Sequence, residues 1–311
     1  MYGLQTEVSP SSGRLQPVIR ANGAVVARFP HPNDGPVELA GVTSRTGINF
    51  HVKTDGNDDL DGLSWDTAVA SFTKAIERAT AGRGDQVHAR PGDYDEAEID
   101  VNKADLAIIG HGANGAVGIT PSSGINGMKI TANDVVLQNI RIEGVNDSDY
   151  GLSIGDSSNE VLGVRVYGCL LRNGTHATAP AVLIHGAGDL YIVGCDIAWA
   201  GRGVEFKGGS ESYPSQIFIL GNQFHDLVRF HLSQRVIPDN IENGKVVGLS
   251  HKGNTHLGLE DGTEPADAFL SLGQVGTSGM IARNDFATAT NAIGTFGLTT
   301  TVMWVANGTE A

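Results

Sequence analysis

Short apolar runs recur beyond Ala104 at a nearly constant spacing. In each run apolar and polar positions alternate, as in half-buried β-strands, and the run ends in a bend that often contains glycine. Aligning seven runs places these residues in one bend column: His111, Ile140, Cys169, Cys195, Asn222, Asn254 and Asn284. Successive members are 29, 29, 26, 27, 32 and 30 residues apart. Such a period predicts a β-solenoid of about seven coils, because one coil cannot bury its own apolar face but a stack can.

Two columns beside the bend column are mostly apolar and are predicted to face the core. Two residues after the bend stand Ile142, Leu171, Ile197, Phe224, His256 and Phe286. Three residues before it stand Ile108, Leu137, Val166, Ile192, Ile219, His251 and Ile281. The alternating position four residues before the bend should then face outward, and it holds Val136, Arg165, Tyr191, Phe218 and Met280. An exposed stripe of this kind favours a subunit interface over a sugar groove.

One stretch has the apolar spacing of a helix. Phe72, Ala75, Ile76 and Ala79 share one helix face, Ser64 or Asp66 can cap its start, and Gly82 ends it. The first 36 residues instead contain five of the eleven prolines and keep no apolar period, which predicts an extended arm. The predicted organisation is an arm over 1–47, an entry strand, capping helix and first turn over 48–105, coils over 106–290, and C-terminal strands or a plug over 291–311. Trp304, in the last segment, either helps to plug the open end of the stack or pairs with another subunit.

Composition and charge narrow the classes of function. The 42 glycines among 311 residues suit a fold that bends every few residues. The net charge of −14 repels nucleic acid and anionic membranes. Residues 1–20 lack the pattern of a signal peptide, and no apolar run is long enough to span a membrane. The sequence therefore predicts synthesis in a host cytoplasm without export, and release inside a larger particle.

Residues 50–96 combine an Asp-Gly-Asn…Asp-Gly loop, the amphipathic helix and a Pro-Gly-Asp-Tyr turn. This segment resembles the entry segment of right-handed parallel β-helix proteins of the pectate-lyase-like superfamily, and the repeats resemble its coils. The resemblance covers roughly residues 48–290 and implies an all-β, right-handed parallel β-helix. It implies no single function, because this fold carries lyases, hydrolases, epimerases and inert structural proteins. A bacteriophage-encoded member is the favoured source.

The resemblance also implies a ladder of stacked asparagines at Asn222, Asn254 and Asn284, each amide bonding the backbone of the next coil. Cys169 and Cys195 take the same inward position. They are interpreted as small buried fillers, with a disulfide between adjacent coils as the alternative.

The loop TDGNDDLDGLSWDTA raises the question of a metal. Asp55, Asn57, Asp59 and Asp61 alternate like the oxygen ligands of a calcium loop. The sixth position of that pattern is Leu60 where glycine is needed, and no glutamate closes the loop. The loop is therefore interpreted as a turn and helix cap with no metal or cofactor, calcium being the alternative.

A catalytic solenoid would carry carboxylates on outward positions of neighbouring coils. The best candidates are Asp196, Glu205, His225 and Asp226, which could act as acid and base in glycoside cleavage. Trp199 lies nearby in the sequence and is a candidate sugar platform. Gly110-His111-Gly112 resembles a segment of polygalacturonases, but the other segments of that family are missing, so a tight bend is favoured. The remaining histidines show no familiar metal spacing.

Two hypotheses of function follow. The favoured one is a non-catalytic bacteriophage virion protein that decorates or cements the capsid shell, forms a homo-oligomer, in particular a trimer, and is anchored by its N-terminal arm. The alternative is a carbohydrate-active enzyme, a polysaccharide lyase or glycoside hydrolase resembling tailspike depolymerases, which acts on a surface polysaccharide.

Overall fold

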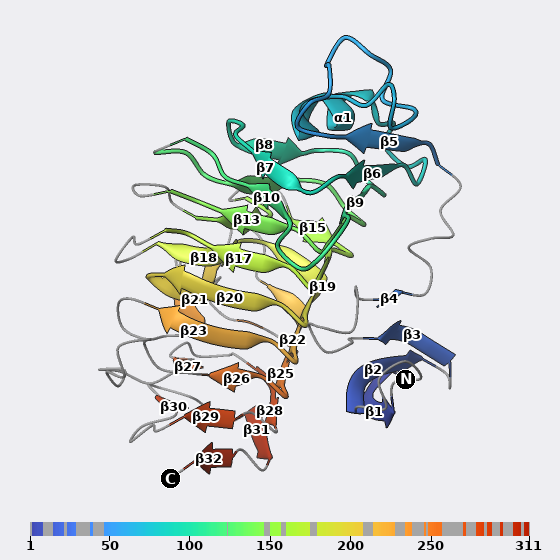
Figure 1. The fold of residues 1–311 in the computed structure, drawn as a ribbon. Coiled ribbons are helices and arrows are strands. Elements are labelled where there is room, and N and C mark those ends of the chain that lie inside the picture. Colours follow the sequence, from blue (N-terminus) through green and yellow to red (C-terminus); the bar gives the residue numbers. More distant parts are fainter. Residues whose placement is uncertain are drawn as a thin grey trace.

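In the computed structural model, complete residues are described over 47–122, 124–145, 150–156, 160–174, 179–207 and 214–225, together with residues 227, 246, 248–255 and 278. Further strands are described by their backbone alone. The chain winds into a stack of coils with three parallel sheets along its sides (Figure 1). Each coil visits the three sheets in the same order before it returns to the first.

Sheet 1 has eleven strands, and neighbours in its order are hydrogen-bonded. The order is β31 (Thr301–Val305), β28 (Ser278–Ala282), β25 (Leu249–Lys252), β22 (Ser215–Leu220), β19 (Ala187–Val193), β16 (Arg165–Tyr167), β12 (Val136–Gln138), β9 (Ala107–Gly110), β6 (Gln86–Ala89) and β5 (Asn49–Val52). The remaining strand, β15 (Val161–Leu162), pairs separately with β19. Sheet 2 has nine strands in the order β32 (Gly308–Glu310), β29 (Asp285–Ala287), β26 (Thr255–His256), β23 (Gln223–Leu227), β20 (Asp196–Ala200), β17 (Leu170–Arg172), β13 (Arg141–Glu143), β10 (Val117–Ile119) and β7 (Gly92–Tyr94). Sheet 3 has eight strands in the order β30 (Ile293–Gly294), β27 (Leu270–Ser271), β24 (Gln234–Ile237), β21 (Arg202–Lys207), β18 (Pro180–Ile184), β14 (Leu152–Ile154), β11 (Met128–Ile130) and β8 (Ile99–Val101).

The strand register confirms the columns predicted from the sequence. In sheet 1, Leu137 pairs with Ile108 on one side and Val166 on the other, and the column continues to Ile281. In sheet 2, Leu171 pairs with Ile142 and Ile197, and that column reaches Phe286. The inward members whose side chains are described are buried in one continuous hydrophobic core. The coils therefore supply each other with the apolar contacts that a single coil lacks.

The predicted asparagine ladder is present at the bend between sheets 1 and 2. Asn222 Oδ1 accepts a hydrogen bond from the Cys195 backbone N–H at 2.8 Å, and Asn254 Oδ1 accepts one from the Asn222 backbone N–H at 2.9 Å. The side-chain amides donate to the carbonyls of Ile192 and Ile219, both at 3.0 Å. Asn284 lies outside the described residues.

The two cysteines occupy the same bend column on the preceding coils. Cys169 and Cys195 are free, buried thiols, so the filler interpretation fits the structure. Burial raises the pKa of the Cys195 thiol well above its ordinary value. The Cys195 thiol is therefore protonated near neutral pH.

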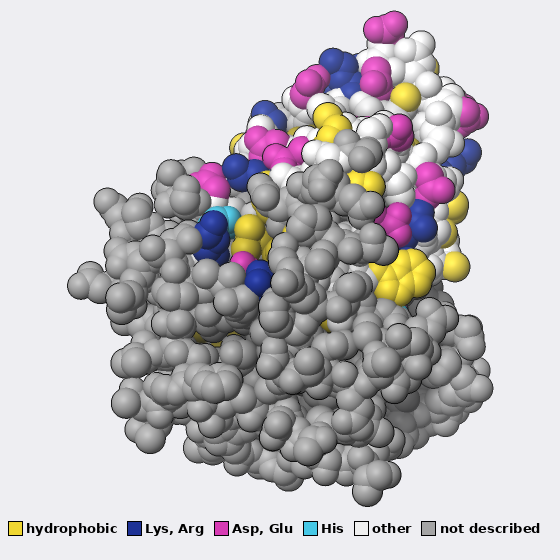
Figure 2. Space-filling view, turned by 90° about the vertical axis from the view of Figure 1, so that its left-hand side faces the viewer, with side chains coloured by type: hydrophobic (Ala, Val, Ile, Leu, Met, Phe, Trp, Pro, Cys, Tyr) yellow, Lys and Arg dark blue, Asp and Glu magenta, His cyan; other side chains and the backbone are white. Residues whose placement is uncertain are grey.

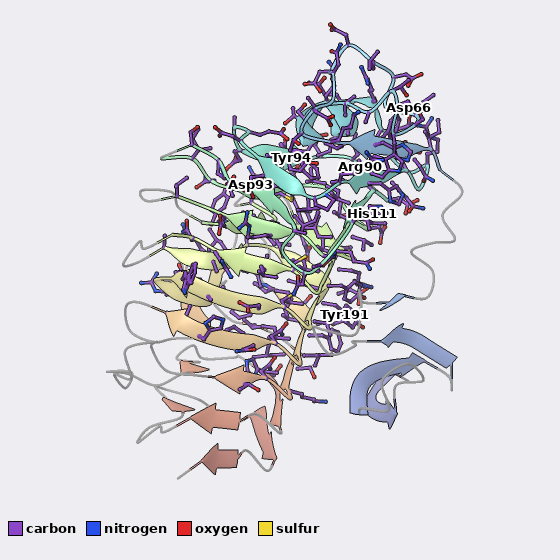
Figure 3. All side chains as sticks on the ribbon, viewed as in Figure 1. Asp66, Arg90, Asp93, Tyr94, His111 and Tyr191 are labelled. Carbon is purple, nitrogen blue, oxygen red and sulfur yellow. The ribbon has the colours of Figure 1, made fainter. Side chains whose placement is uncertain are left out.

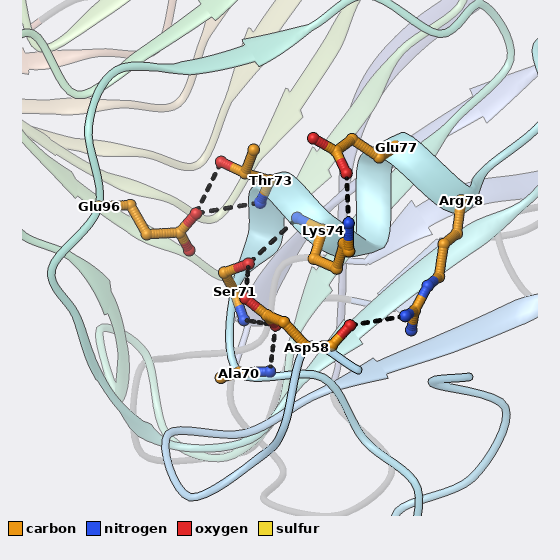
Figure 4. Close-up of polar contacts among 8 residues, drawn as sticks. All are labelled: Asp58, Ala70, Ser71, Thr73, Lys74, Glu77, Arg78 and Glu96. Atoms are coloured by element: carbon orange, nitrogen blue, oxygen red, sulfur yellow. Dashed lines mark hydrogen bonds and ion pairs between the residues drawn. The ribbon is translucent and has the colours of Figure 1, made fainter. Parts of the chain in front are cut away.

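Helix α1 (Phe72–Arg78) is shorter than the sequence predicts, and it starts at a different cap. Its N-cap is Ser71, not Ser64 or Asp66, and it ends before Gly82. Asp58 supports the cap through its carboxylate, which accepts hydrogen bonds from the backbone N–H groups of Ala70 and Ser71 and from the Ser71 hydroxyl (Figure 4). The apolar side of α1 is buried against the first coil. Among the described residues, no helix is long and apolar enough to cross a membrane.

The two ends of the chain also form strands. The described backbone within residues 1–47 forms a four-stranded antiparallel sheet of β1 (Tyr2–Val8), β2 (Leu15–Ala21), β3 (Ala24–Arg28) and β4 (Glu38–Leu39), and an anchoring arm remains a prediction. At the other end, β31 and β32 pair in parallel with β28 and β29. Strands β31 and β32 therefore continue sheets 1 and 2.

Candidate functional site

The three candidate catalytic residues whose side chains are described, Asp196, Glu205 and His225, do not form one group. Asp196 on β20 and His225 on β23 meet on the outer face of sheet 2, where Asp196 Oδ1 lies 3.1 Å from His225 Nε2. Glu205 lies on β21 of sheet 3, is buried, and forms an ion pair with Arg202. The side chain of Asp226 lies outside the described residues. Of the predicted residues whose side chains are described, Asp196 and His225 are thus in contact with each other.

A row of charged side chains that the sequence reasoning missed crosses the outer face of sheet 2. Arg141 forms an ion pair with Asp93, two strands away, and its Nε lies 4.0 Å from Glu143 Oε2. Arg172 Nη1 lies 3.6 Å from Glu143 Oε1 on the adjacent strand. These four side chains form the charged row, in which negative and positive groups alternate.

Gly118 leaves room for the ion pair between Asp93 and Arg141. Gly118 stands in register between Asp93 and Arg141. A Cβ atom there would come within 2.2 Å of Arg141 Nη2 and 2.6 Å of Asp93 Oδ1. A larger residue at this position would therefore push the two charged groups apart.

Trp199 extends the charged row with an exposed aromatic ring. Its side chain is 45% exposed, and the Arg172 guanidinium carbon lies 4.3 Å from the ring centroid. Its backbone has φ +47°, a left-handed conformation that is unfavourable for a bulky residue. The Trp199 carbonyl accepts a hydrogen bond from the Asn173 N–H at 3.1 Å, which helps to hold this conformation. Such local strain is commonly found where a side chain is directed toward a ligand.

Charges of both signs are interspersed on the described part of the face shown in Figure 2. The charged row also contains both signs, since each of its guanidinium groups lies next to a carboxylate. This arrangement offers donors and acceptors side by side, which suits hydroxyl groups better than a row of phosphates.

The Asp-rich loop holds itself together through its own side chains. Asn57 Oδ1 accepts a hydrogen bond from the Asp59 N–H at 2.9 Å, and Asp61 Oδ1 accepts one from the Leu63 N–H at 3.0 Å. Hydrogen bonds from the Thr67 side chain and from the Leu63 backbone N–H lower the pKa of Asp61. Asp55 lies 3.8 Å from Lys53. In the part of the chain that the structure describes, no three histidine, cysteine or carboxylate side chains are grouped so that they could hold a metal ion.

The predicted interface stripe lies in one outward column of sheet 1. Arg165, Tyr191 and Phe218 follow each other in register, with the Arg165 guanidinium 4.3 Å from the Tyr191 ring and the Tyr191 and Phe218 centroids 4.4 Å apart. The aromatic rings stack on each other, so much of their faces is already covered. Beside them lies a second hydrophobic cluster that includes Val193 and Leu220. The side chain of Trp304 lies outside the described residues.

The fold and its outer faces place the chain in the class of right-handed parallel β-helix proteins. No protein-family pattern and no curated protein sequence matches the chain. Among solved structures, it is similar to the pectin methylesterase from Aspergillus niger, with a TM-score of 0.53, 12% identity and coverage of 86% of each chain. Pectin methylesterase PemA from Erwinia chrysanthemi gives a TM-score of 0.49 with 13% identity over 81% of each chain. Pectate lyase Pel9A gives 0.36 with 11% identity, over 81% of this chain and 78% of the other. At such low identity these likenesses concern the fold alone.

Proposed function

We propose that the protein binds a polysaccharide along the outer face of sheet 2. The main observation behind this proposal is Trp199. Its ring is exposed next to the charged row, and its backbone has a strained, left-handed conformation. A flat indole is a suitable platform for the C–H face of a sugar ring, and the neighbouring guanidinium and carboxylate groups can bond its hydroxyls. The names of the structural relatives, which are enzymes of pectin, agree with a polysaccharide ligand.

Arg172 connects the two parts of this proposed site. Its guanidinium stacks on Trp199 and also lies near Glu143, so it fixes the ring relative to the carboxylates of the row. A sugar stacked on the exposed part of the indole would then lie beside Arg172 and Glu143. The coils are about 4.8 Å apart, and this spacing sets the distance between the protein's polar side chains on successive coils. A bound glycan would lie along this row of side chains.

Replacing Trp199 by alanine should weaken polysaccharide binding at least tenfold, because an aromatic anchor commonly contributes on the order of 2 kcal/mol to affinity. Titration calorimetry with capsular, pectic and alginate polymers measures the change. Leu162→Ala, which removes another exposed apolar side chain, is the matched control and should bind like the wild type. Equal affinity of Trp199→Ala and wild type for every polymer that binds would contradict the proposed site.

The Asp196–His225 pair is the part of this face that could transfer a proton. Incubation of the protein with the same polymers, followed by assays for new reducing ends and unsaturated uronates, separates an enzyme from a binding protein. Turnover that Asp196→Asn abolishes would assign the protein to the lyases or hydrolases. Binding without turnover would support the non-catalytic role.

A virion structural role is a second proposal, favoured by the stacked Arg165, Tyr191 and Phe218 on a different sheet. Such a stack suits a flat protein partner, either the capsid shell or further copies in a trimer. We expect the full-length protein to sediment with assembled shells and a chain lacking residues 1–45 to stay in the supernatant. Unchanged sedimentation of the shortened chain would contradict anchoring by the N-terminal segment.

A further inference from the structure

Three histidines form a cluster at the start of the stack, on the outer face of sheet 1. His51 on β5 pairs in register with His88 on β6, and their ring centroids are 6.0 Å apart. His88 Nδ1 lies 3.0 Å from Nε2 of His111, which follows β9. We refer to His51, His88 and His111 as the histidine cluster.

Trp65 connects this cluster to the entry loop, residues 53–70. Its ring centroid lies 4.5 Å from that of His51 and 5.7 Å from that of His111, both edge-on. The Arg90 guanidinium carbon lies 4.6 Å from the same ring. Figure 3 shows Arg90 and His111 on one side of the stack, close below the entry loop. The indole thus attaches the entry loop to the outer face of sheet 1.

The entry loop covers the free edge of sheet 1. Strand β5 is the last strand of that sheet, and its outer edge is hydrogen-bonded to the loop. The backbone N–H of His51 donates to Gly62 at 2.7 Å, and its carbonyl accepts from Val69 at 2.9 Å. The His51 ring Nδ1 also lies 3.2 Å from the Gly62 carbonyl. An open strand edge invites pairing with another chain, so this covering keeps the end of the stack closed.

The histidines of the cluster contact one another and the Trp65 ring. His88 is faced by His51 from β5 and by His111 from the end of β9. Trp65 from the entry loop contacts His51 and His111, and the Arg90 guanidinium lies over the Trp65 ring. Among the described residues, no carboxylate forms a hydrogen bond or ion pair with any of the three imidazoles. Protonation of more than one ring would therefore place like charges in contact without a counter-ion.

We propose that the histidine cluster is an acid-sensitive latch, which holds the entry loop over β5 when its imidazoles are neutral and releases it when they become protonated. Burial, together with His111 and His51, lowers the pKa of His88 to about 4, and burial with His51 lowers that of His111. A folded-state pKa below the unfolded value of 6.5 means that the latched form loses stability on acidification. The latch is at full strength above pH 6.5 and weakens as the pH falls toward 4.

The test follows the entry loop directly while the coils are monitored separately. In a chain that carries Trp199→Phe and Trp304→Phe, the emission of Trp65 should change with a midpoint between pH 4 and 6.5. Hydrogen exchange of residues 49–70, corrected for the intrinsic effect of pH, should become at least tenfold faster over the same range. The far-ultraviolet circular dichroism should stay constant, because the coils remain stacked.

Two variants decide the origin of this response. His88→Gln with His111→Gln leaves one imidazole at the site, and its entry loop should show no acid-induced release. His225→Gln, which removes a histidine on sheet 2, should respond like the wild type. If the double variant does not fold, the ring proton signals of His88 and His111 in the wild type should titrate together with loop release. The proposal is overturned if the loop stays protected down to pH 4, if the double variant keeps the wild-type midpoint, or if release coincides with unfolding of the coils.

Discussion

Asp85→Asn should lower the free energy of unfolding by about 3 kcal/mol at pH 7, because it removes a buried negative charge that accepts hydrogen bonds with both of its oxygens. Asp85 is 1% exposed. Its oxygens accept hydrogen bonds from the backbone N–H groups of Ile48 and Thr80, both at 2.8 Å, and from two nitrogens of Arg83, both at 2.6 Å. An amide can replace one of the acceptor oxygens but presents donors where the other stood.

The effect of this substitution should depend on pH. Burial raises the pKa of Asp85, but the hydrogen bonds from Arg83, Thr80 and Ile48 outweigh it and hold the pKa below the ordinary 3.8. Because the folded-state pKa is the lower one, the carboxylate stabilises the fold above the unfolded value and loses this contribution as the pH falls below it. The difference between wild type and variant should therefore shrink below about pH 4.

Urea unfolding at several pH values measures both effects. Asp100→Asn is the control, since Asp100 is exposed and bonds only near the surface to Asn102 and Thr131. It should change the free energy of unfolding by less than about 0.5 kcal/mol. A loss below 1 kcal/mol in Asp85→Asn would show that the buried ion pair contributes little.

Asn222→Leu should also destabilise the protein by about 3 kcal/mol, although leucine has the same branched side-chain skeleton and suits a buried site. The amide of Asn222 satisfies the Cys195 N–H and the Ile192 carbonyl and also donates to Asn254 Oδ1. Leucine would remove the side-chain hydrogen bonds of the buried Cys195 N–H and Ile192 carbonyl, and water cannot reach these groups in the core.

Denaturant titration of Asn222→Leu and of Asn102→Leu gives the comparison. Asn102 is exposed and bonds only to Asp100, at 3.3 Å, so its replacement should be nearly neutral. Equal stability of Asn222→Leu and wild type would mean that the ladder marks the bend but does not stabilise it.

The regular part of the fold could be predicted because its physical cause is periodic. Inward columns must be apolar on every coil, so the core residues appear in the sequence at the spacing of the coils. The cap of α1 has no such signal. Asp58 reaches Ser71 across 13 residues, and nothing in the local sequence distinguishes this pair from Ser64 or Asp66.

The candidate site was predictable in part. Glu143 and Arg172 each stand one residue after an inward column, so their pairing on adjacent coils could have been inferred from the alignment itself. The left-handed backbone of Trp199 depends on three-dimensional context and leaves no mark in the sequence. His51 and His88 were missed because β5 and β6 precede the repeats, and a helix separates them along the chain.

The bend column has a consequence for how such a chain can change its length. Cys169 and Cys195 occupy equivalent positions on successive coils, 195 − 169 = 26 residues apart. Excising residues 169–194 would join Gly168 to Cys195 and bring the neighbours of the lost coil into the same register. The molecule can therefore grow or shrink in whole coils, which sets the distance between its two ends in fixed steps without redesigning either one.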